Sequence, residues 1–255
     1  YDESRLSALE TRMAHYLSAS AVSAKNLAEE KDSIKTLIGD ISHQTKTPIA
    51  NLLLYAQLLG EQDLPPESRE YASALEHQAE KLRFLIDALV KTSRLESGVL
   101  AMTPKRHGIQ QLLDAASAQA APGAEAKAIT LTVEPTDLTA RFDPKWTAEA
   151  LYNLVDNAVK YTPAGGAVTL RAVGYELFCR VDVTDTGPGI PESEQARIFQ
   201  RFYRSPSASE AEGVGIGLYL ARQIAAGQGG YLKVSSRPGE GSTFSLFLPR
   251  AEERT

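Results

Sequence analysis

The chain has 255 residues, of which 43% are hydrophobic and 23% are charged, and its formal net charge is −5. These proportions are ordinary for a globular protein, and the acidic balance argues against direct binding of nucleic acid. The single cysteine, Cys179, excludes a disulfide within the chain. No apolar run approaches the roughly 20 residues that cross a bilayer.

The first hundred residues are almost free of glycine and proline and predict two long helices. Leu27, Ile34 and Ile41 recur every seven residues, which is typical of a coiled coil. The helix continues to Leu59, and the segment 60–66 with its two prolines interrupts it. A second helix over 67–96 completes an antiparallel hairpin. Covering both apolar stripes requires a second copy of the chain, so we expect a homodimeric four-helix bundle.

After residue 98, glycine, proline and β-branched residues become more frequent and predict an α+β layer without regular alternation. We therefore divide the chain into an N-terminal signalling segment (1–33), a helical hairpin domain (34–98) and an α/β domain (99–255). The expected helices of the last domain cover 109–121, 144–161 and 214–227. The expected strands cover 129–134, 167–173, 176–184, 231–235 and 242–248.

His43 lies on the first predicted helix, followed by Gln44, Thr47 and Pro48. At about 100° per residue, His43 faces away from Ile41 and its apolar stripe, whereas Thr47 shares the face of His43. Taken alone, such a residue is more commonly an ordinary surface histidine, and that reading holds for the other three histidines of the chain.

The helix expected over 144–161 begins with Asp143-Pro144, a residue pair that favours helix initiation. Asn153 and Asn157 lie four residues apart on one face, and Lys160 follows. Amide oxygens beside a lysine suit Mg²⁺ bound to a phosphate. The alternative is a solvated polar face.

The strand expected over 176–184 ends in Asp185-Thr-Gly187-Pro-Gly189. Glycines let the backbone approach a flat ligand closely, and the carboxylate can accept a hydrogen bond from an exocyclic amine such as that of adenine. The alternative is a plain turn at a strand end.

A second glycine-rich segment opens the helix expected over 214–227. Gly213, Gly215 and Gly217 precede free N–H groups, which favour an anionic phosphate. Their G-x-G-x-G spacing argues against a dinucleotide fold, which needs G-x-G-x-x-G directly after a strand. A third segment, Gly239-Glu-Gly241, is typical of a hairpin turn.

In this order the motifs resemble those of the sensor histidine kinases of two-component systems, over about His43 to Leu248. The resemblance implies a dimeric phosphoacceptor hairpin followed by a Bergerat-type ATP-binding domain, with ATP and Mg²⁺ as cofactors. It implies a response regulator receiver domain as partner. It also implies the cytoplasmic part of a bacterial membrane protein, anchored through a segment that precedes residue 1.

By this resemblance His43 is the phosphoacceptor, and Gln44 and Thr47 are its neighbours in the catalytic motif. Asn153 and Asn157 stand at the Mg²⁺ positions, Lys160 at a phosphate contact and Tyr161 beside the nucleotide. The remaining ATP-binding positions are Asp185, Gly187, Gly189, Phe199, Arg201, Phe202, Arg204, Gly213, Gly215, Gly217, Leu218 and Thr243.

One position departs from the family pattern. An acidic residue usually follows the phosphoacceptor, whereas this chain has Gln44, which cannot act as a general base. We therefore expect the kinase reaction, whereas dephosphorylation of the partner would lack the acidic residue that usually orients water. Two alternatives stay open, namely a Bergerat-type ATPase of the chaperone or DNA-repair kind and a degenerate kinase that serves only as a scaffold.

Overall fold

The computed structural model describes residues 2–96, 102–205 and 214–250, except for some side chains within the two long helices, that of His43 among them. The chain folds into two compact units, Tyr1–Leu100 and Ala101–Thr255. The expected fold class is confirmed, because a helical unit precedes a mixed α/β unit. Subdivision of the first unit at residue 33 stays a prediction.

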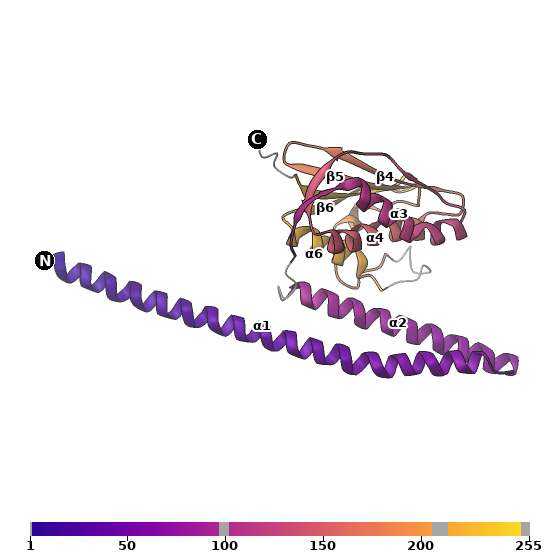
Figure 1. Cartoon of the computed structure of the whole chain (residues 1–255), viewed down its shortest axis with the longest axis horizontal. Helices are drawn as coiled ribbons and strands as arrows, with labels where there is room; N and C mark the ends of the chain where they lie inside the picture. Colours follow the sequence, from indigo (N-terminus) through magenta and orange to yellow (C-terminus); the bar gives the residue numbers. More distant parts are fainter. Residues whose placement is uncertain (1, 97–101, 206–213, 251–255) are drawn as a thin grey trace. The chain divides into compact units, whose positions relative to one another are not determined.

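The first unit is an antiparallel hairpin of α1 (Asp2–Gly60) and α2 (Pro66–Glu96) (Figure 1). Pro66 is the first residue of α2, where its missing N–H costs no hydrogen bond. The helices pack through Ile49, Leu53 and Ala79, and an ion pair of 2.8 Å joins Lys46 Nζ to Asp87 Oδ1.

The hairpin also carries large apolar side chains that it does not cover. Leu52 and Leu59 are seven residues apart on α1, and Leu75, Leu82 and Leu89 follow the same interval on α2. All five are exposed in the single chain. A heptad interval is typical of a stripe that packs against another helix.

The second unit is built on a mixed sheet in the order β2-β4-β5-β7-β6. β2 and β4 are parallel, and the other neighbouring pairs are antiparallel. A separate two-stranded sheet pairs β1 with β3. The bounds are β1 (Lys105–Gly108), β2 (Thr130–Val133), β3 (Thr139–Phe142), β4 (Ala167–Gly174), β5 (Phe178–Asp185), β6 (Tyr231–Arg237) and β7 (Gly241–Pro249).

Three helices, α3 (Ile109–Ala126), α4 (Pro144–Tyr161) and α6 (Gly217–Gly227), cover one face of this sheet (Figure 1). Their apolar faces and alternate residues of the strands form the core. Its fully buried members include Leu151, Leu154, Val181, Leu246 and Leu248. The sheet and α4 therefore hold the loops at the strand ends in place.

Several elements differ from the sequence prediction. α3 continues past Pro122 to Ala126, because Ala124 is buried and tertiary packing compensates for the proline. β1 and β3 were not expected, since Lys105–Gly108 has no apolar side chain and Thr139–Phe142 has only two, Ala140 and Phe142. The short helices α5 (Glu192–Gln195) and η1 (Arg197–Phe199) occupy part of the expected polar segment. α6 begins at Gly217 rather than at Val214.

The C-terminal end of α4 is capped by a lysine from another element. Lys127 Nζ donates to the carbonyl oxygens of Val159, Lys160 and Thr162 at 2.9, 2.8 and 2.6 Å. The last carbonyl groups of a helix have no N–H donor within the helix, and Lys127 supplies one to them. A positive charge at this end also interacts favourably with the helix dipole. Lys127 therefore fixes the end of α4 that carries Lys160 and Tyr161.

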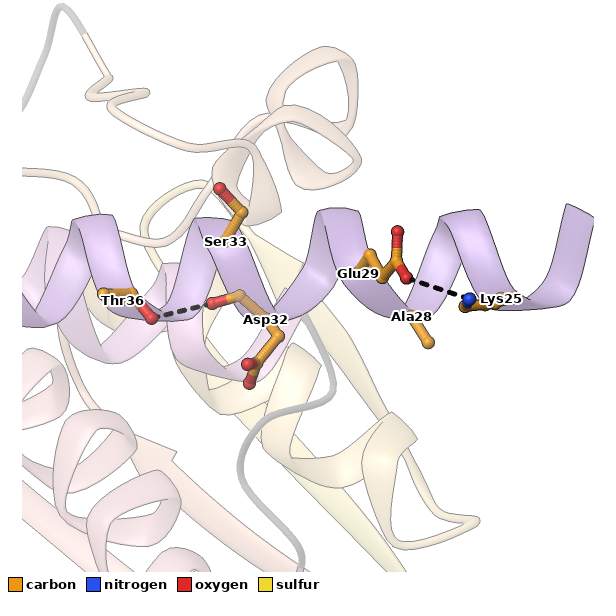
Figure 2. Close-up of a pocket in the computed structure, with 6 residues that line it drawn as sticks. All are labelled: Lys25, Ala28, Glu29, Asp32, Ser33 and Thr36. Atoms are coloured by element: carbon orange, nitrogen blue, oxygen red, sulfur yellow. Dashed lines mark hydrogen bonds and ion pairs between the residues drawn. The ribbon is translucent and has the colours of Figure 1, made fainter.

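A shallow depression lies along α1 (Figure 2). Lys25 Nζ and Glu29 Oε1 form an exposed ion pair of 3.7 Å there, and Thr36 Oγ1 donates to the Asp32 carbonyl at 3.0 Å. Residues of a single helix line it, so it is a surface of that helix rather than an enclosed cavity. Among the described helices, none is both long and apolar enough to span a membrane.

Candidate active site

The N-terminal end of α4 is fixed by Asp143. Its Oδ1 accepts from the backbone N–H groups of Lys145 and Trp146 at 3.1 and 3.2 Å, as expected of an N-cap. Its Oδ2 accepts from the N–H of Thr103 at 3.0 Å. One buried carboxylate thus joins the first residues of the second unit to the helix that carries the two asparagines.

A buried glutamine completes this junction. Gln228 Oε1 accepts from the backbone N–H of Asp143 and from Thr147 Oγ1, while its Nε2 donates to the carbonyl of Ile224. Gln228 follows α6, so it ties the C-terminal end of α6 to the start of α4. The sequence offers no periodic signal for this contact, because the bonded residues are more than eighty positions apart.

The pKa of Asp143 lies below its ordinary value. Burial would raise it, but the N–H groups of Thr103, Trp146 and Lys145 stabilise the ionised form and prevail. The carboxylate should therefore stabilise the fold fully above the unfolded pKa of about 3.9, and this contribution should be lost as the pH falls through the lower folded pKa.

Asp143→Asn should lower the free energy of unfolding by about 1–2 kcal/mol near neutral pH, because an amide N–H₂ cannot accept from Thr103. In urea unfolding at stepwise lower pH, the difference from wild type should narrow below about pH 4. Asp137→Asn, at an exposed position of the same unit, is the matched control. A difference for Asp143→Asn that is constant with pH would contradict the assignment.

The two asparagines of α4 direct their amide nitrogens back onto their own helix. Asn153 Nδ2 donates to the Glu149 carbonyl and Asn157 Nδ2 to the Asn153 carbonyl, each at 2.8 Å. The side-chain oxygens are left for other partners. Asn153 Oδ1 lies where a Cβ on Gly217 would meet it at 2.7 Å, so Gly217 lets α6 approach α4 closely.

This arrangement fits a magnesium ion bound mainly through phosphate. Mg²⁺ prefers oxygen ligands, keeps several waters and takes few ligands from the protein. Asn157 Oδ1 has no hydrogen-bond partner in the described part of the chain. Asn153 Oδ1 is turned toward Gly217, so Asn157 is the better placed of the two expected ligands.

Lys160 and Tyr161 end the same helix. Lys160 Nζ lies 5.5 Å from the centre of the Tyr161 ring, which suits a cation–π contact. Burial raises the pKa of the Tyr161 hydroxyl, and the nearby Arg204 guanidinium opposes that shift. Arg204, which lies after η1 in the chain, is therefore near Tyr161 at the C-terminal end of α4.

Asp185 ends β5 and is buried. Its Oδ1 accepts both the N–H of Gly187 at 2.8 Å and the N–H of Ser242 at 3.2 Å. Its Oδ2 makes no hydrogen bond among the described residues, so this oxygen is available to a ligand donor. Burial raises the pKa of Asp185, although the two backbone N–H groups oppose the shift.

The backbone around Asp185 leaves room only for glycine. A Cβ on Gly187 would lie 2.8 Å from Asp185 Oδ1, and one on Gly189 would lie 2.0 Å from the Arg237 carbonyl oxygen. Gly189 also has a φ of 74°, which other residues rarely adopt. The glycines of this loop therefore let it pack closely against Asp185 and Arg237, and the expected approach of its backbone to a flat ligand stays a prediction.

Thr243 is not brought to Asp185. In the β5–β7 register Asp185 faces Ser242, whereas Thr243 faces Thr184, and the two threonine hydroxyls are 3.1 Å apart. Because side chains alternate between the two faces of a strand, Thr243 lies on the other face of the sheet. Ser242, which was not predicted, is the residue of β7 that contacts Asp185.

The chain segments on the two sides of residues 206–213 are in contact through Phe202, Tyr203 and Gly215. Phe202 N–H donates to the Gly215 carbonyl at 2.9 Å, and a Cβ on Gly215 would lie 2.4 Å from the Tyr203 carbonyl oxygen. Phe199 is buried, while Phe202 is 50% exposed and has a φ of 62°. A phenylalanine in that conformation is strained. Gly213 lies outside the described residues.

The remaining expected positions lie around α6. The Arg201 guanidinium carbon lies 5.3 Å from the centre of the Tyr219 ring of α6, so Arg201 packs on α6 in this structure. Leu218 is the second residue of α6 and is partly buried. Of the two arginines considered for phosphate contact, Arg204 acts on the pKa of Tyr161, and Arg201 contacts Tyr219.

The expected phosphoacceptor motif lies in the first unit. His43 lies within α1, but its side chain is outside the described residues. Gln44 and Thr47 are exposed, and α1 continues through Pro48. The motif is therefore part of a continuous helix surface.

Family models match both units. Residues 33–98 match the "His Kinase A (phospho-acceptor) domain", and residues 142–252 match the "Histidine kinase-, DNA gyrase B-, and HSP90-like ATPase" family. The first match includes His43, and the second includes Asn157 and Asp185.

Several curated bacterial proteins are similar along most of the chain. Sensor protein DivL of Caulobacter vibrioides is 33% identical over 92% of this chain and 31% of its own length. Sensor protein GacS of Pseudomonas syringae pv. syringae is 31% identical over 90% of this chain and 27% of its own length. The chain thus spans about a third or less of these relatives.

Solved structures agree with these matches. Full-length ShkA in complex with AMPPNP is 28% identical, with a TM-score of 0.72 over 86% of this chain and 47% of its own. The mycobacterial sensor histidine kinase MprB is 26% identical, with a TM-score of 0.52 over 59% of this chain and 99% of its own. The chain belongs to the sensor histidine kinases and comprises their phosphoacceptor and ATPase domains.

Proposed function

We propose that this chain transfers the γ-phosphoryl group of ATP to His43 and then to an aspartate on the receiver domain of a response regulator. The observation that carries the ATP half is the unpaired Oδ2 of buried Asp185, held by two backbone N–H groups on Oδ1. The match of residues 33–98 to a phosphoacceptor domain supports the histidine half.

In the ATP site each group has a distinct part. Asp185 Oδ2 accepts from the exocyclic amine of adenine, and Gly187 and Gly189 let the loop after Asp185 pack closely against Asp185 and Arg237. Asn157 Oδ1 would hold Mg²⁺, which offsets the negative charge of the phosphates when it is bound. Lys160 and Arg204 lie at the same end of α4 and bring positive charge to the phosphates.

The phosphoryl transfer itself demands little covalent chemistry from the protein. A neutral imidazole nitrogen of His43 attacks the γ-phosphorus, an N–P bond forms, and the bond to the bridging oxygen breaks so that ADP leaves. A neutral imidazole carries an unprotonated ring nitrogen that is itself a nucleophile, so the amide of Gln44 does not prevent attack. Positioning and charge neutralisation supply the catalysis.

The second transfer moves the phosphoryl group from the imidazole nitrogen to a carboxylate oxygen of the partner. We propose these two transfers as the activity, because Gln44 has no carboxylate to orient a water molecule for hydrolysis of the partner's phosphoaspartate. We also propose a homodimer, since the heptad stripe of Leu52, Leu75 and Leu82 is exposed in the single chain. Anchoring of the whole protein in a membrane stays a prediction.

The decisive experiment is incubation of the wild-type chain with Mg²⁺ and ATP labelled at the γ-phosphate. We expect label on the protein that is stable in alkali and lost in mild acid, as a phosphoramidate is, and that moves to a receiver domain on addition. Hydrolysis of ATP without labelled protein would favour the Bergerat-type ATPase alternative. Absence of nucleotide binding would favour the scaffold.

A further inference from the structure

The loop after Asp185 is anchored to the hairpin between β6 and β7 by both backbone groups of one residue. Ile190 N–H donates to Ser236 Oγ at 2.8 Å. The Ile190 carbonyl accepts from Gln195 Nε2 at 3.0 Å, and the same nitrogen lies 2.9 Å from the Ser236 carbonyl oxygen. Ile190 is therefore held from both sides by Ser236 and Gln195, which we call the Ser236 clasp.

The clasp also reaches the residue that holds Asp185. Ser236 Oγ donates to the Gly241 carbonyl at 2.8 Å and lies 3.0 Å from Ser242 Oγ. Because a hydroxyl has one hydrogen to donate, Ser242 donates to Ser236 in the second contact. Ser242 in turn gives its backbone N–H to Asp185 Oδ1. A continuous hydrogen-bonded chain thus runs from Ile190 through Ser236 to Asp185.

The hairpin fits closely around the same loop. Gly239 N–H donates to the Pro188 carbonyl at 2.7 Å. A Cβ on Gly241 would lie 2.0 Å from the Asp185 carbonyl oxygen. The hairpin between β6 and β7 therefore packs directly against the loop after Asp185. The sequence had predicted only a simple turn from its glycines.

We infer that Ser236, supported by Gln195, is a positioning residue that sets the place of Asp185 Oδ2 and so the selectivity of the site for adenine over guanine. The inference rests on the proposed ATP site, although not on phosphoryl transfer. Adenine offers an exocyclic amine to Asp185, whereas guanine presents a carbonyl oxygen at the corresponding position. Displacement of Asp185 should therefore weaken adenine binding more than guanine binding.

The test compares Ser236→Ala with Ser235→Ala, a neighbouring exposed serine of β6. Calorimetric titration with ADP and with GDP, both with Mg²⁺, gives the selectivity without any chemical step. Ser236→Ala should lower the ADP preference about tenfold, the effect of roughly one lost hydrogen bond. Ser235→Ala should leave the preference unchanged, and Ser236→Thr, which keeps the hydroxyl, should restore it.

Hydrogen exchange of the nucleotide-free protein provides a second readout. The amide of Ile190 should exchange faster in Ser236→Ala and keep its wild-type rate in Ser235→Ala. Gln195→Ala should lower the ADP preference in the same direction, which keeps the test valid if Ser236→Ala folds poorly. Equal losses of ADP and GDP affinity, or unchanged selectivity, would overturn the inference.

The two proposals fail in distinguishable ways. If the wild-type chain prefers ADP but forms no phosphohistidine, the kinase function is refuted. The positioning role of Ser236 is then still supported if Ser236→Ala lowers the ADP preference and Ser235→Ala does not. If the wild-type chain forms phosphohistidine at His43 and the Ser236→Ala variant keeps the ADP preference, only the positioning role of Ser236 is refuted.

Discussion

Replacing His43 with alanine is expected to abolish the acid-labile label that the chain acquires from ATP. Alanine has no nucleophilic nitrogen, so no N–P bond can form whatever the state of the ATP site. Binding of ATP should stay unchanged, because the proposed contacts to the nucleotide come from the second unit. Gel autoradiography after alkaline and acid treatment measures the first quantity, and calorimetry the second.

His77→Ala is the matched control for this variant. His77 is an exposed histidine on α2 of the same hairpin, and it has no threonine and proline in the spacing that follows His43. Its label should equal that of the wild type. Label that persists in His43→Ala, or that disappears in His77→Ala, would contradict the assignment of His43 as phosphoacceptor.

Asp185→Asn is expected to weaken ATP binding by at least about a hundredfold, because a buried donor would then face the adenine amine without an acceptor. The asparagine oxygen can still accept from Gly187 and Ser242, so the loop keeps its anchor. The N–H₂ group then stands in place of Oδ2 and can donate to a carbonyl oxygen instead. Relative affinity should therefore shift from ATP toward GTP, as titration with both nucleotides would reveal.

Asp182→Asn serves as the control for a buried aspartate on the same strand. Asp182 pairs with Arg180 Nη2 at 2.9 Å and accepts from Ser245 Oγ at 2.6 Å, and it lies on the face of β5 opposite Asp185. Asp182→Asn can lower stability but should leave the ratio of ATP to GTP affinity unchanged. A similar shift in both variants would show that Asp185 has no direct contact with the base.

The parts of the site that could be predicted are those whose signals are local. Asp143-Pro144 starts α4 and the apolar spacing carries it to Tyr161, so the expected and observed bounds of this helix coincide. These features depend on residues a few positions apart, and short-range rules describe them well.

The features that could not be predicted join distant residues. Thr243 was placed in the site from its motif, but strand register turns it away and brings Ser242 to Asp185. Gln228, Lys127 and Ser236 have no motif of their own, since a side chain becomes a cap or an anchor only where another element lies within hydrogen-bond distance.

The sequence by itself determined the order of the two units and the family, and it predicted His43, Asn157 and Asp185 as the chemical groups of the site. Residue type and local spacing specify which atoms can donate, accept or attack. The tertiary structure alone decided that Asp185 Oδ1 accepts from Gly187 and Ser242, that Oδ2 has no hydrogen bond among the described residues, and that Ser236 contacts Ser242. Which oxygen of Asp185 accepts the backbone hydrogen bonds depends on where the backbones of β5, β6 and β7 lie. The packing of the whole sheet sets those positions.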